Sequence, residues 1–283
     1  MRALHRCLYV PPHPPRGRNS ALARARRRSW RVLAAATLGI LSLGPMAGGA
    51  RTLTEVLARG VISQCANPDA LPHSSRQADP PGFQIEIGRA LAQALGVRHE
   101  IDWIVPRARA GLVDCDLLFD TIVTPETQRG PLKLSRAYQK SGVALALRAG
   151  PAPLETFADI GPGQRIGVMV NSLASKLLGQ RGVRTVPYVF EQEMVQDLAK
   201  GELDGCAVSP ATIAYYIHAH PASGLRYAHA YDTEPELRWN LAVGMRRSDD
   251  ALADAINRAL DRLIEDGTLT RIYASYGVEY RQP

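Results

Sequence analysis

Residues 114–136 read DCDLLFDTIVTPETQRGPLKLSR, and the fold is decided within this stretch. Its apolar part, LLF, is followed by the polar pair Asp120 and Thr121 and then by a Thr-Pro-Glu turn. A short apolar run that ends at a proline-marked turn is typical of a buried strand. We therefore predict a strand over residues 116–123, with Asp120 and Thr121 near its carboxyl end.

Strands and helices alternate on both sides of this stretch. A helix over 83–95 carries its apolar residues on one face and is followed by Gly96, a residue type that commonly ends helices. The same patterns predict strands over 61–66, 99–104, 165–170, 185–189 and 203–208, and helices over 172–180 and 192–200. Alternation of this kind indicates parallel sheets with helices on their faces, and its repetition indicates two α/β lobes.

Two crossings are expected to join these lobes. Residues 150–153 read GPAP and mark the first crossing, whereas a strand over 238–245 carries the chain back. The predicted division is residues 51–148 for the first part of lobe 1, 149–235 for lobe 2, and 236–283 for the return strand and C-terminal helices of lobe 1. The helix over 249–266 has Ser248 as its predicted N-cap, and we expect it to pack on lobe 1. Small-molecule sites concentrate in clefts between lobes, at the carboxyl ends of parallel strands.

The net positive charge of the chain comes from its first 50 residues. These residues hold nine arginines and no acid, whereas the whole chain has a net charge of +7, so the remainder carries 25 basic and 27 acidic side chains. Nucleic-acid binding is therefore not expected. An apolar run over 32–43 and a cluster of small residues follow the arginines, as in a signal peptide. We predict cleavage after Ala50 and a periplasmic mature protein; the alternative is an uncleaved anchor over 32–50.

Three cysteines remain after this predicted cleavage. Cys65 closes one predicted strand and Cys115 opens another, so a disulfide between them would link neighbouring strands of one sheet. It would stabilise the fold by about 2 to 4 kcal/mol in the chain-entropy model. Cys206 falls in a short apolar strand, where a thiol serves as a small apolar side chain. No CxxC, phosphate-loop, HExxH or GxSxG pattern occurs, so we predict no metal, no cofactor and no catalytic residue.

Several segments together resemble the bacterial extracellular solute-binding proteins of family 3. The segments are residues 82–87, 115–118 with 124–126, 135–138, and 250–278. This resemblance implies a type II periplasmic-binding-protein-like fold: two α/β lobes, each a mixed, mostly parallel sheet flanked by helices, joined by two hinge strands. It also implies a non-enzymatic protein, a monomer, with a small-molecule ligand and an ABC permease as its partners.

The chain departs from the amino-acid receptors of that family at two positions. Those receptors hold the ligand's carboxylate with an arginine after the Thr-Pro-Glu turn, where this chain has Thr127. They hold the amino group with an acid at the end of the last strand of lobe 2, where this chain has Ser209. Loss of a buried charged partner costs roughly 2 to 5 kcal/mol. We therefore expect a ligand other than an ordinary α-amino acid; the alternative is a transporter subunit for amino acids or organic acids.

A narrower resemblance and an enzymatic alternative also bear on function. CANPDALP at residues 65–72, with Cys115 at the start of the third strand, is similar to the binding proteins associated with pyrroloquinoline-quinone alcohol dehydrogenases. That similarity implies a quinoprotein dehydrogenase as partner. Some cyclohexadienyl dehydratases also resemble this family, and Asp120 and Glu126 could then supply acid or base chemistry.

Ten residues are candidates for contact with the ligand. They are Asn67, His73, Phe83, Trp103, Asp120, Thr121, Arg129, Asn171, Ser172 and Ser209. Most have a structural alternative. Asn171 with Ser172, and Ser209, could simply cap helices, and Phe83 and Trp103 could belong to the core. Asp120 could pair with an arginine instead of a ligand, and Arg129 could be an exposed helix residue.

Overall fold

The computed structural model describes residues 51–104, 115–150, 154–246 and 248–283, all of which fall within one compact unit, Ala47–Pro283. The predicted signal peptide, residues 1–50, lies outside the described residues. Among the residues described, no helix is long and apolar enough to cross a membrane.

The first sheet has six strands in the described part of the chain. They are β1 (Val61–Ala66), β4 (Arg98–Trp103), β5 (Leu117–Ile122), β6 (Leu132–Leu134), β7 (Gln139–Gly142) and β13 (Arg238–Arg246). The order is β4-β1-β5-β13-β6, and β7 also pairs with β13. β1 is parallel to β4 and β5, whereas β13 is antiparallel to β5. The strands predicted around Cys65 and Leu118 are confirmed, and so is the return of the chain through β13.

The second sheet repeats this arrangement. Its strands are β8 (Ala144–Arg148), β9 (Arg165–Met169), β10 (Arg184–Tyr188), β11 (Gly205–Val208) and β12 (Leu225–Ala228), in the order β10-β9-β11-β8-β12. β9 is parallel to β10 and β11, and β8 is antiparallel to β11. A small separate pair, β2 (Asp69–Ala70) and β3 (Ser74–Ser75), lies in the loop after β1. The two-lobed α/β fold expected from the sequence is therefore confirmed.

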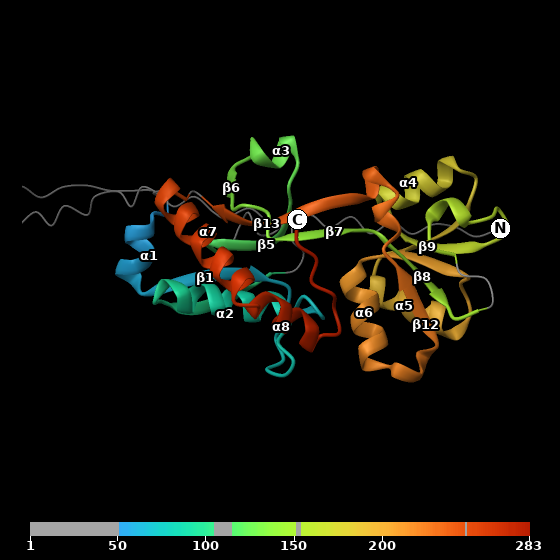
Figure 1. Cartoon of the computed structure of the whole chain (residues 1–283), viewed down its shortest axis with the longest axis horizontal. Helices are drawn as coiled ribbons and strands as arrows, with labels where there is room; N and C mark the ends of the chain where they lie inside the picture. Colours follow the sequence, from blue (N-terminus) through green and yellow to red (C-terminus); the bar gives the residue numbers. More distant parts are fainter. Residues whose placement is uncertain (1–50, 105–114, 151–153, 247) are drawn as a thin grey trace, which may run out of the picture. The chain divides into compact units, whose positions relative to one another are not determined.

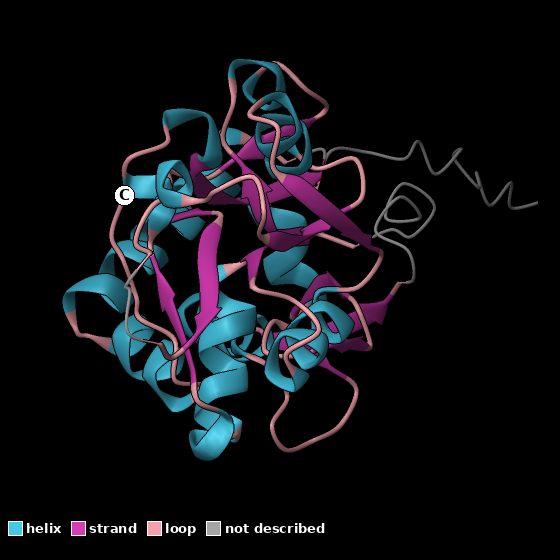
Figure 2. Ribbon diagram, turned by 90° about the vertical axis from the view of Figure 1, so that its right-hand side faces the viewer, coloured by secondary structure: helices cyan, strands magenta, loops and turns pink. Residues whose placement is uncertain are grey.

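The helices divide between the two sheets. Figure 1 shows α1, α2, α7 and α8 grouped with β1 and β5, and α4, α5 and α6 grouped with β8, β9 and β12. In the view turned by 90°, helices lie beside the strands (Figure 2). The bounds are α1 (Leu53–Arg59), α2 (Phe83–Leu95), α3 (Pro125–Gln128), α4 (Leu173–Gln180), α5 (Glu191–Lys200), α6 (Pro210–Ala219), α7 (Asp250–Glu265) and α8 (Thr268–Ser275), with short 3-10 turns η2 (Phe157–Asp159), η3 (Pro221–Ser223), η4 (Ala230–Asp232) and η5 (Pro235–Leu237).

Helix α7 packs on the first sheet, as predicted. Leu252, Ile256 and Leu260 are buried in one apolar cluster with Ile62 of β1 and Leu117 of β5. The predicted N-cap of this helix was wrong by one residue. Asp249, not Ser248, accepts the hydrogen bond from the Leu252 N–H. A carboxylate at this position reaches the first free amides of the helix and is stabilised by their partial positive charge.

The crossing into the second sheet lies earlier than the proline-marked segment. β7 pairs with β13, and the next strand, β8, lies between β11 and β12 in the second sheet. The predicted boundary at residue 149 therefore falls after β8, and the chain crosses near Val143. The apolar run of β8 fits either sheet, so only its long-range pairing assigns it to the second.

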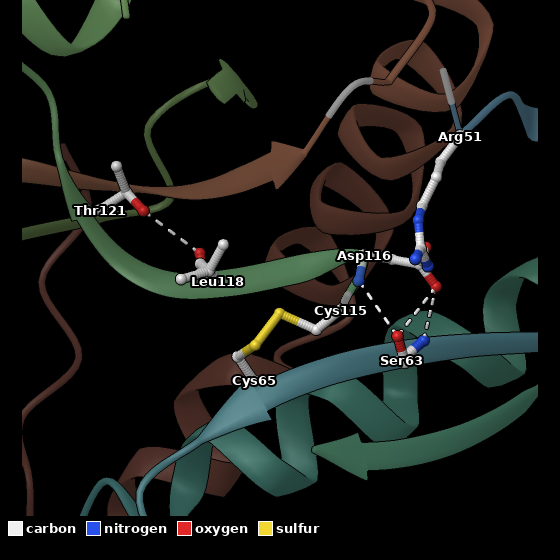
Figure 3. The surroundings of a disulfide bond; sticks show 7 residues. All are labelled: Arg51, Ser63, Cys65, Cys115, Asp116, Leu118 and Thr121. Carbon is white, nitrogen blue, oxygen red and sulfur yellow. Dashed lines mark hydrogen bonds and ion pairs between the residues drawn. A yellow bond between two sulfur atoms is a disulfide. The ribbon is translucent and has the colours of Figure 1, made fainter. Parts of the chain in front are cut away.

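A disulfide joins Cys65 to Cys115, with a Cα–Cα distance of 5.5 Å, and links the end of β1 to the start of β5 (Figure 3). Beside it, the buried Asp116 carboxylate accepts bonds from the backbone and hydroxyl of Ser63 and from the guanidinium groups of Arg51 and Arg59. Cys206 is free and fully buried, and burial raises the pKa of its thiol, as suits a core residue.

Candidate functional site

A cavity of about 300 Å³ lies between residues of the two sheets. Its lining comes from the loop after β1, from the ends of β5, β9 and β11, and from β7, β13 and the first residues of α4 and α5. The lining residues are His73, Asp120, Ile122, Ser141, Gly142, Val143, Met169, Ser172, Ala174, Glu191, Ala207, Val208, Ser209, Trp239 and Leu241. The cavity is therefore at the carboxyl ends of parallel strands from both sheets, where ligands of open α/β sheets bind.

Asp120 accepts most of the side-chain hydrogen bonds described for the cavity wall of the first lobe. Its Oδ2 accepts from His73 Nδ1 at 3.0 Å and from Gln84 Nε2, and its Oδ1 accepts from the Tyr138 hydroxyl at 3.0 Å. The backbone of Asp120 has a φ of 53°, in the left-handed region that aspartate tolerates better than most residues. Such backbone conformations concentrate at functional sites, where the surrounding contacts hold them in place.

Two neighbours of Asp120 have defined roles in this wall. Burial, followed by the nearby Asp120 charge, raises the pKa of Tyr138 well above its ordinary value, so its hydroxyl stays protonated and donates. His73 Nδ1 lies 3.0 Å from Asp120 Oδ2, and because a carboxylate only accepts, Nδ1 is the donor of this bond. The His73 side chain retains 27% of its exposure and lines the cavity.

Glu191 organises the wall formed by the second lobe. Its Oε1 accepts from the Ser209 N–H at 2.9 Å and its Oε2 from the Thr212 hydroxyl at 2.6 Å. Ser209 is the N-cap of α6 and Pro210 follows it, as predicted, but the Ser209 side chain makes no capping bond. Glu191, the first residue of another helix, holds that helix terminus instead. Glu191 was not predicted as a site residue, because its proximity to Ser209 depends on the pairing of β9 with β11.

The two candidates after β9 differ in what they do. The Ser172 hydroxyl accepts from the Ser175 N–H at 3.0 Å and so caps α4, while the residue also lines the cavity. Asn171 is exposed and has a φ of 57°. Asp120 and Asn171 are thus the described non-glycine residues with left-handed backbone, one on each lobe.

The candidates around the Thr-Pro-Glu turn are not part of the cavity lining. Thr121 is buried and donates to the Leu118 carbonyl at 3.3 Å (Figure 3). Arg129 is exposed, with Glu126 as an ion-pair neighbour at 4.0 Å. Thr127 stands where the sequence comparison expected a ligand-holding arginine, and its hydroxyl accepts from the Thr124 N–H and donates to the Ile122 carbonyl.

A second cavity, of about 260 Å³, lies inside the first lobe. Asn67, His73 and Asp120 line it together with the disulfide residue Cys65. Phe83 is 1% exposed and packs its ring against His73 and Tyr273, with ring centroids 4.9 and 4.7 Å away. It is a core residue that also supports His73. Trp103 stacks under the Arg76 guanidinium at 5.6 Å.

The two cavities share His73 and Asp120, so these residues separate an interlobe space from an intralobe space. No lysine or arginine is among the described residues that line the interlobe cavity. In the part of the chain that the structure describes, no cluster of histidine, cysteine, aspartate and glutamate could hold a metal ion.

Comparisons with known proteins agree with the two-lobed fold. The sequence profile of bacterial extracellular solute-binding proteins, family 3, matches residues 62–279. The lysine/arginine/ornithine-binding periplasmic protein of Escherichia coli (strain K12) is 25% identical, over 72% of this chain and 83% of its own length. The membrane-bound lytic murein transglycosylase F of Serratia proteamaculans (strain 568) is also 25% identical, over 79% of this chain and 47% of its own length. An ancestral cationic amino acid solute-binding protein has a similar fold, with a TM-score of 0.67 and 21% identity, over 79% of this chain and 98% of its own.

Proposed function

Since the chain belongs to the bacterial extracellular solute-binding proteins of family 3, we propose that it binds a small ligand in the interlobe cavity and closes its lobes around it. The observation that carries this proposal is the lining of the cavity, which draws His73 and Asp120 from one lobe and Glu191 and Ser209 from the other. A ligand that contacts both walls binds the closed state better than the open one, and this difference drives closure.

We further propose that the ligand is not an ordinary α-amino acid. The names of relatives refer to lysine, arginine, ornithine and histidine. In this chain the hydroxyl of Thr127 is engaged in the turn itself, and the described cavity lining offers no guanidinium or ammonium group to an α-carboxylate. A carboxylate that enters the cavity without a cationic partner loses hydration that neutral donors only partly replace.

Ligand screening with two readouts tests the receptor function. Thermal unfolding is measured against amino acids, small amines, polyols and organic acids, and small-angle X-ray scattering then measures compaction with each hit. We expect a true ligand to raise Tm increasingly as its concentration exceeds Kd, and to reduce the radius of gyration. Asp120→Asn should weaken that response, whereas Glu126→Gln, an exposed change outside the cavity, should not. A strong response to an ordinary α-amino acid would contradict the exclusion.

We propose a periplasmic location and an ABC permease as the partner that receives the ligand. The relative from Escherichia coli is periplasmic by name, and other relatives are named as ABC transporter proteins. N-terminal sequencing of the mature protein from an osmotic-shock fraction tests the predicted cleavage, with Arg51 as the expected first residue. Retention of residues 1–50 in a membrane fraction would favour the anchor instead.

A second candidate role is that of an accessory protein to a quinoprotein alcohol dehydrogenase. Cys65 and Cys115, which carry the narrower resemblance, form a disulfide beside the intralobe cavity. Affinity capture from periplasmic extract distinguishes the roles: a quinoprotein dehydrogenase on the column supports the accessory role, and an ABC permease from detergent extract supports transport. We propose binding, not catalysis, in either case, so incubation with prephenate or arogenate should yield no aromatic product.

A further inference from the structure

Glu191 carries a negative charge into the wall of the interlobe cavity. It is partly buried, and both groups that bond to it, the Ser209 amide and the Thr212 hydroxyl, are neutral. Among the described residues, no lysine, arginine or histidine forms an ion pair or hydrogen bond with it. Neutral donors fix the position of a carboxylate but leave its charge in place, and a buried charge of this kind is stabilised further by an opposite charge within about 4 Å.

The surroundings of Glu191 suit one kind of opposite charge. Trp239 lines the same cavity, and Met169, Ala207 and Val208 add apolar surface. Sites that bind organic cations usually combine a carboxylate with aromatic and apolar side chains. The cation makes an ion pair with the carboxylate and favourable contacts with the aromatic and aliphatic groups. His73 and Asp120 of the first lobe line the same cavity.

We infer that the cavity recognises a small organic cation, a protonated amine, and that Glu191 is the acceptor of its charged nitrogen. This inference rests on the proposed receptor function. The carboxylate lies 2.9 Å from the Ser209 amide, so the acid that position 209 lacks is supplied from α5. Because the described lining offers no guanidinium or ammonium group to a carboxylate, the amine binds without a requirement for an α-carboxylate.

Isothermal titration with matched four-carbon probes tests the inference. The probes are 1,4-diaminobutane, 1,4-butanediol and succinate, which differ in charge but little in length. We expect 1,4-diaminobutane to bind and to compact the protein in scattering, with at least tenfold higher affinity than the diol and no detectable binding of succinate.

Two variants locate the interaction at Glu191. Glu191→Gln keeps the shape and one acceptor but removes the charge, and it should weaken diamine binding by about 30-fold or more. Glu193→Gln, a change on the same helix at an exposed residue outside this cavity, is the matched control and should leave the affinity unchanged.

Two further variants distinguish a structural role of Glu191 from a role in binding the charge of the ligand. Ser209→Asp in the Glu191→Gln background restores a carboxylate to the same wall and should recover diamine binding. Thr212→Val removes a hydrogen-bond partner of Glu191 but no charge. If α6 shifts in this variant, the affinities for the diamine and the diol should fall by the same factor.

The outcomes separate the two proposals. If the diol or succinate binds and compacts the protein while the diamine does not, or if Glu191→Gln leaves diamine binding unchanged, the receptor function stands and the amine inference is overturned. If no probe of any charge binds, the amine inference is overturned, and the receptor function is decided by the wider ligand screen.

Discussion

The two lobes share a strand order, yet their cavity walls are held in different ways. In the first lobe, Asp120 accepts from three side chains, and a disulfide and the buried Asp116 cluster fix the strand that carries it. In the second lobe, Glu191 is fixed by one amide and one hydroxyl, and the neighbouring Phe190 is 58% exposed. The first wall is therefore built before a ligand arrives, whereas the second is bound to its lobe by fewer restraints.

This difference indicates that the two walls have different roles when the lobes close. Preorganised polar groups bind with little loss of entropy, so the first wall is suited to receive the ligand. A less restrained wall can adjust its side chains when the lobes close.

Removal of the Asp116 charge should have the largest effect on stability. Asp116→Asn leaves the guanidinium groups of Arg51 and Arg59 facing a neutral amide, and breaking a buried ion pair costs about 3 to 5 kcal/mol. Urea unfolding measures the loss. Glu100→Gln is the control: Glu100 is paired with Arg98 on β4 but both side chains are more than half exposed, so the change should stay below about 1 kcal/mol. Equal losses in the two variants would contradict a special role for the first lobe's cluster.

Loss of the disulfide should rank next. Cys65→Ser with Cys115→Ser releases two points that are 50 residues apart in sequence, and the free energy of unfolding should fall by about 2 to 4 kcal/mol. Thermal melts with and without dithiothreitol measure this. Cys206→Ala in the second lobe should remain as sensitive to the reductant as the unaltered protein, whereas the double variant should be insensitive. A protein whose stability ignores the reductant in every form would show that the bridge contributes nothing.

Acid should destabilise the first lobe through His99. Burial, and then the positive charge of Arg89, lower the pKa of His99 to about 4. Below pH 6.5 the unfolded chain binds a proton that the folded protein does not, so stability falls as the pH decreases towards 4. Between pH 7 and pH 5 the loss is about 2 kcal/mol. His99→Gln should flatten this part of the pH profile; an unchanged slope would assign the acid sensitivity to other groups.

Local patterns in the sequence determined much of the fold. The predicted helix over 83–95 matches α2 at both ends, because its apolar face and Gly96 are local signals. The strand over 61–66 matches β1 for a similar reason. The place of β8 in the second sheet could not be predicted, since an apolar run of five residues gives no information about its partner strand.

The candidate site was predictable where its residues end a strand. Asp120 and Ser209 stand at such ends and were predicted on that ground, and both line the cavity. Tyr138 and Glu191 were missed. Tyr138 reaches Asp120 from residues 135–138, a segment with no strand or helix pattern, and Glu191 reaches Ser209 only because β9 and β11 are neighbours. Positions fixed by tertiary pairing leave no periodic signal in the sequence.

The smallest effect is expected at Phe190, the exposed residue that precedes Glu191. Its side chain is 58% exposed, so Phe190→Ser should change the free energy of unfolding by no more than about 0.5 kcal/mol. Phe83→Ser, a change at a ring that is 1% exposed in the first lobe, is the contrasting variant and should cost about 3 kcal/mol or more. Urea unfolding of both variants compares the ring that supports His73 with the ring that precedes Glu191. A loss above 1 kcal/mol in Phe190→Ser would mean that this residue packs in solution, and the second wall would then be as firmly held as the first.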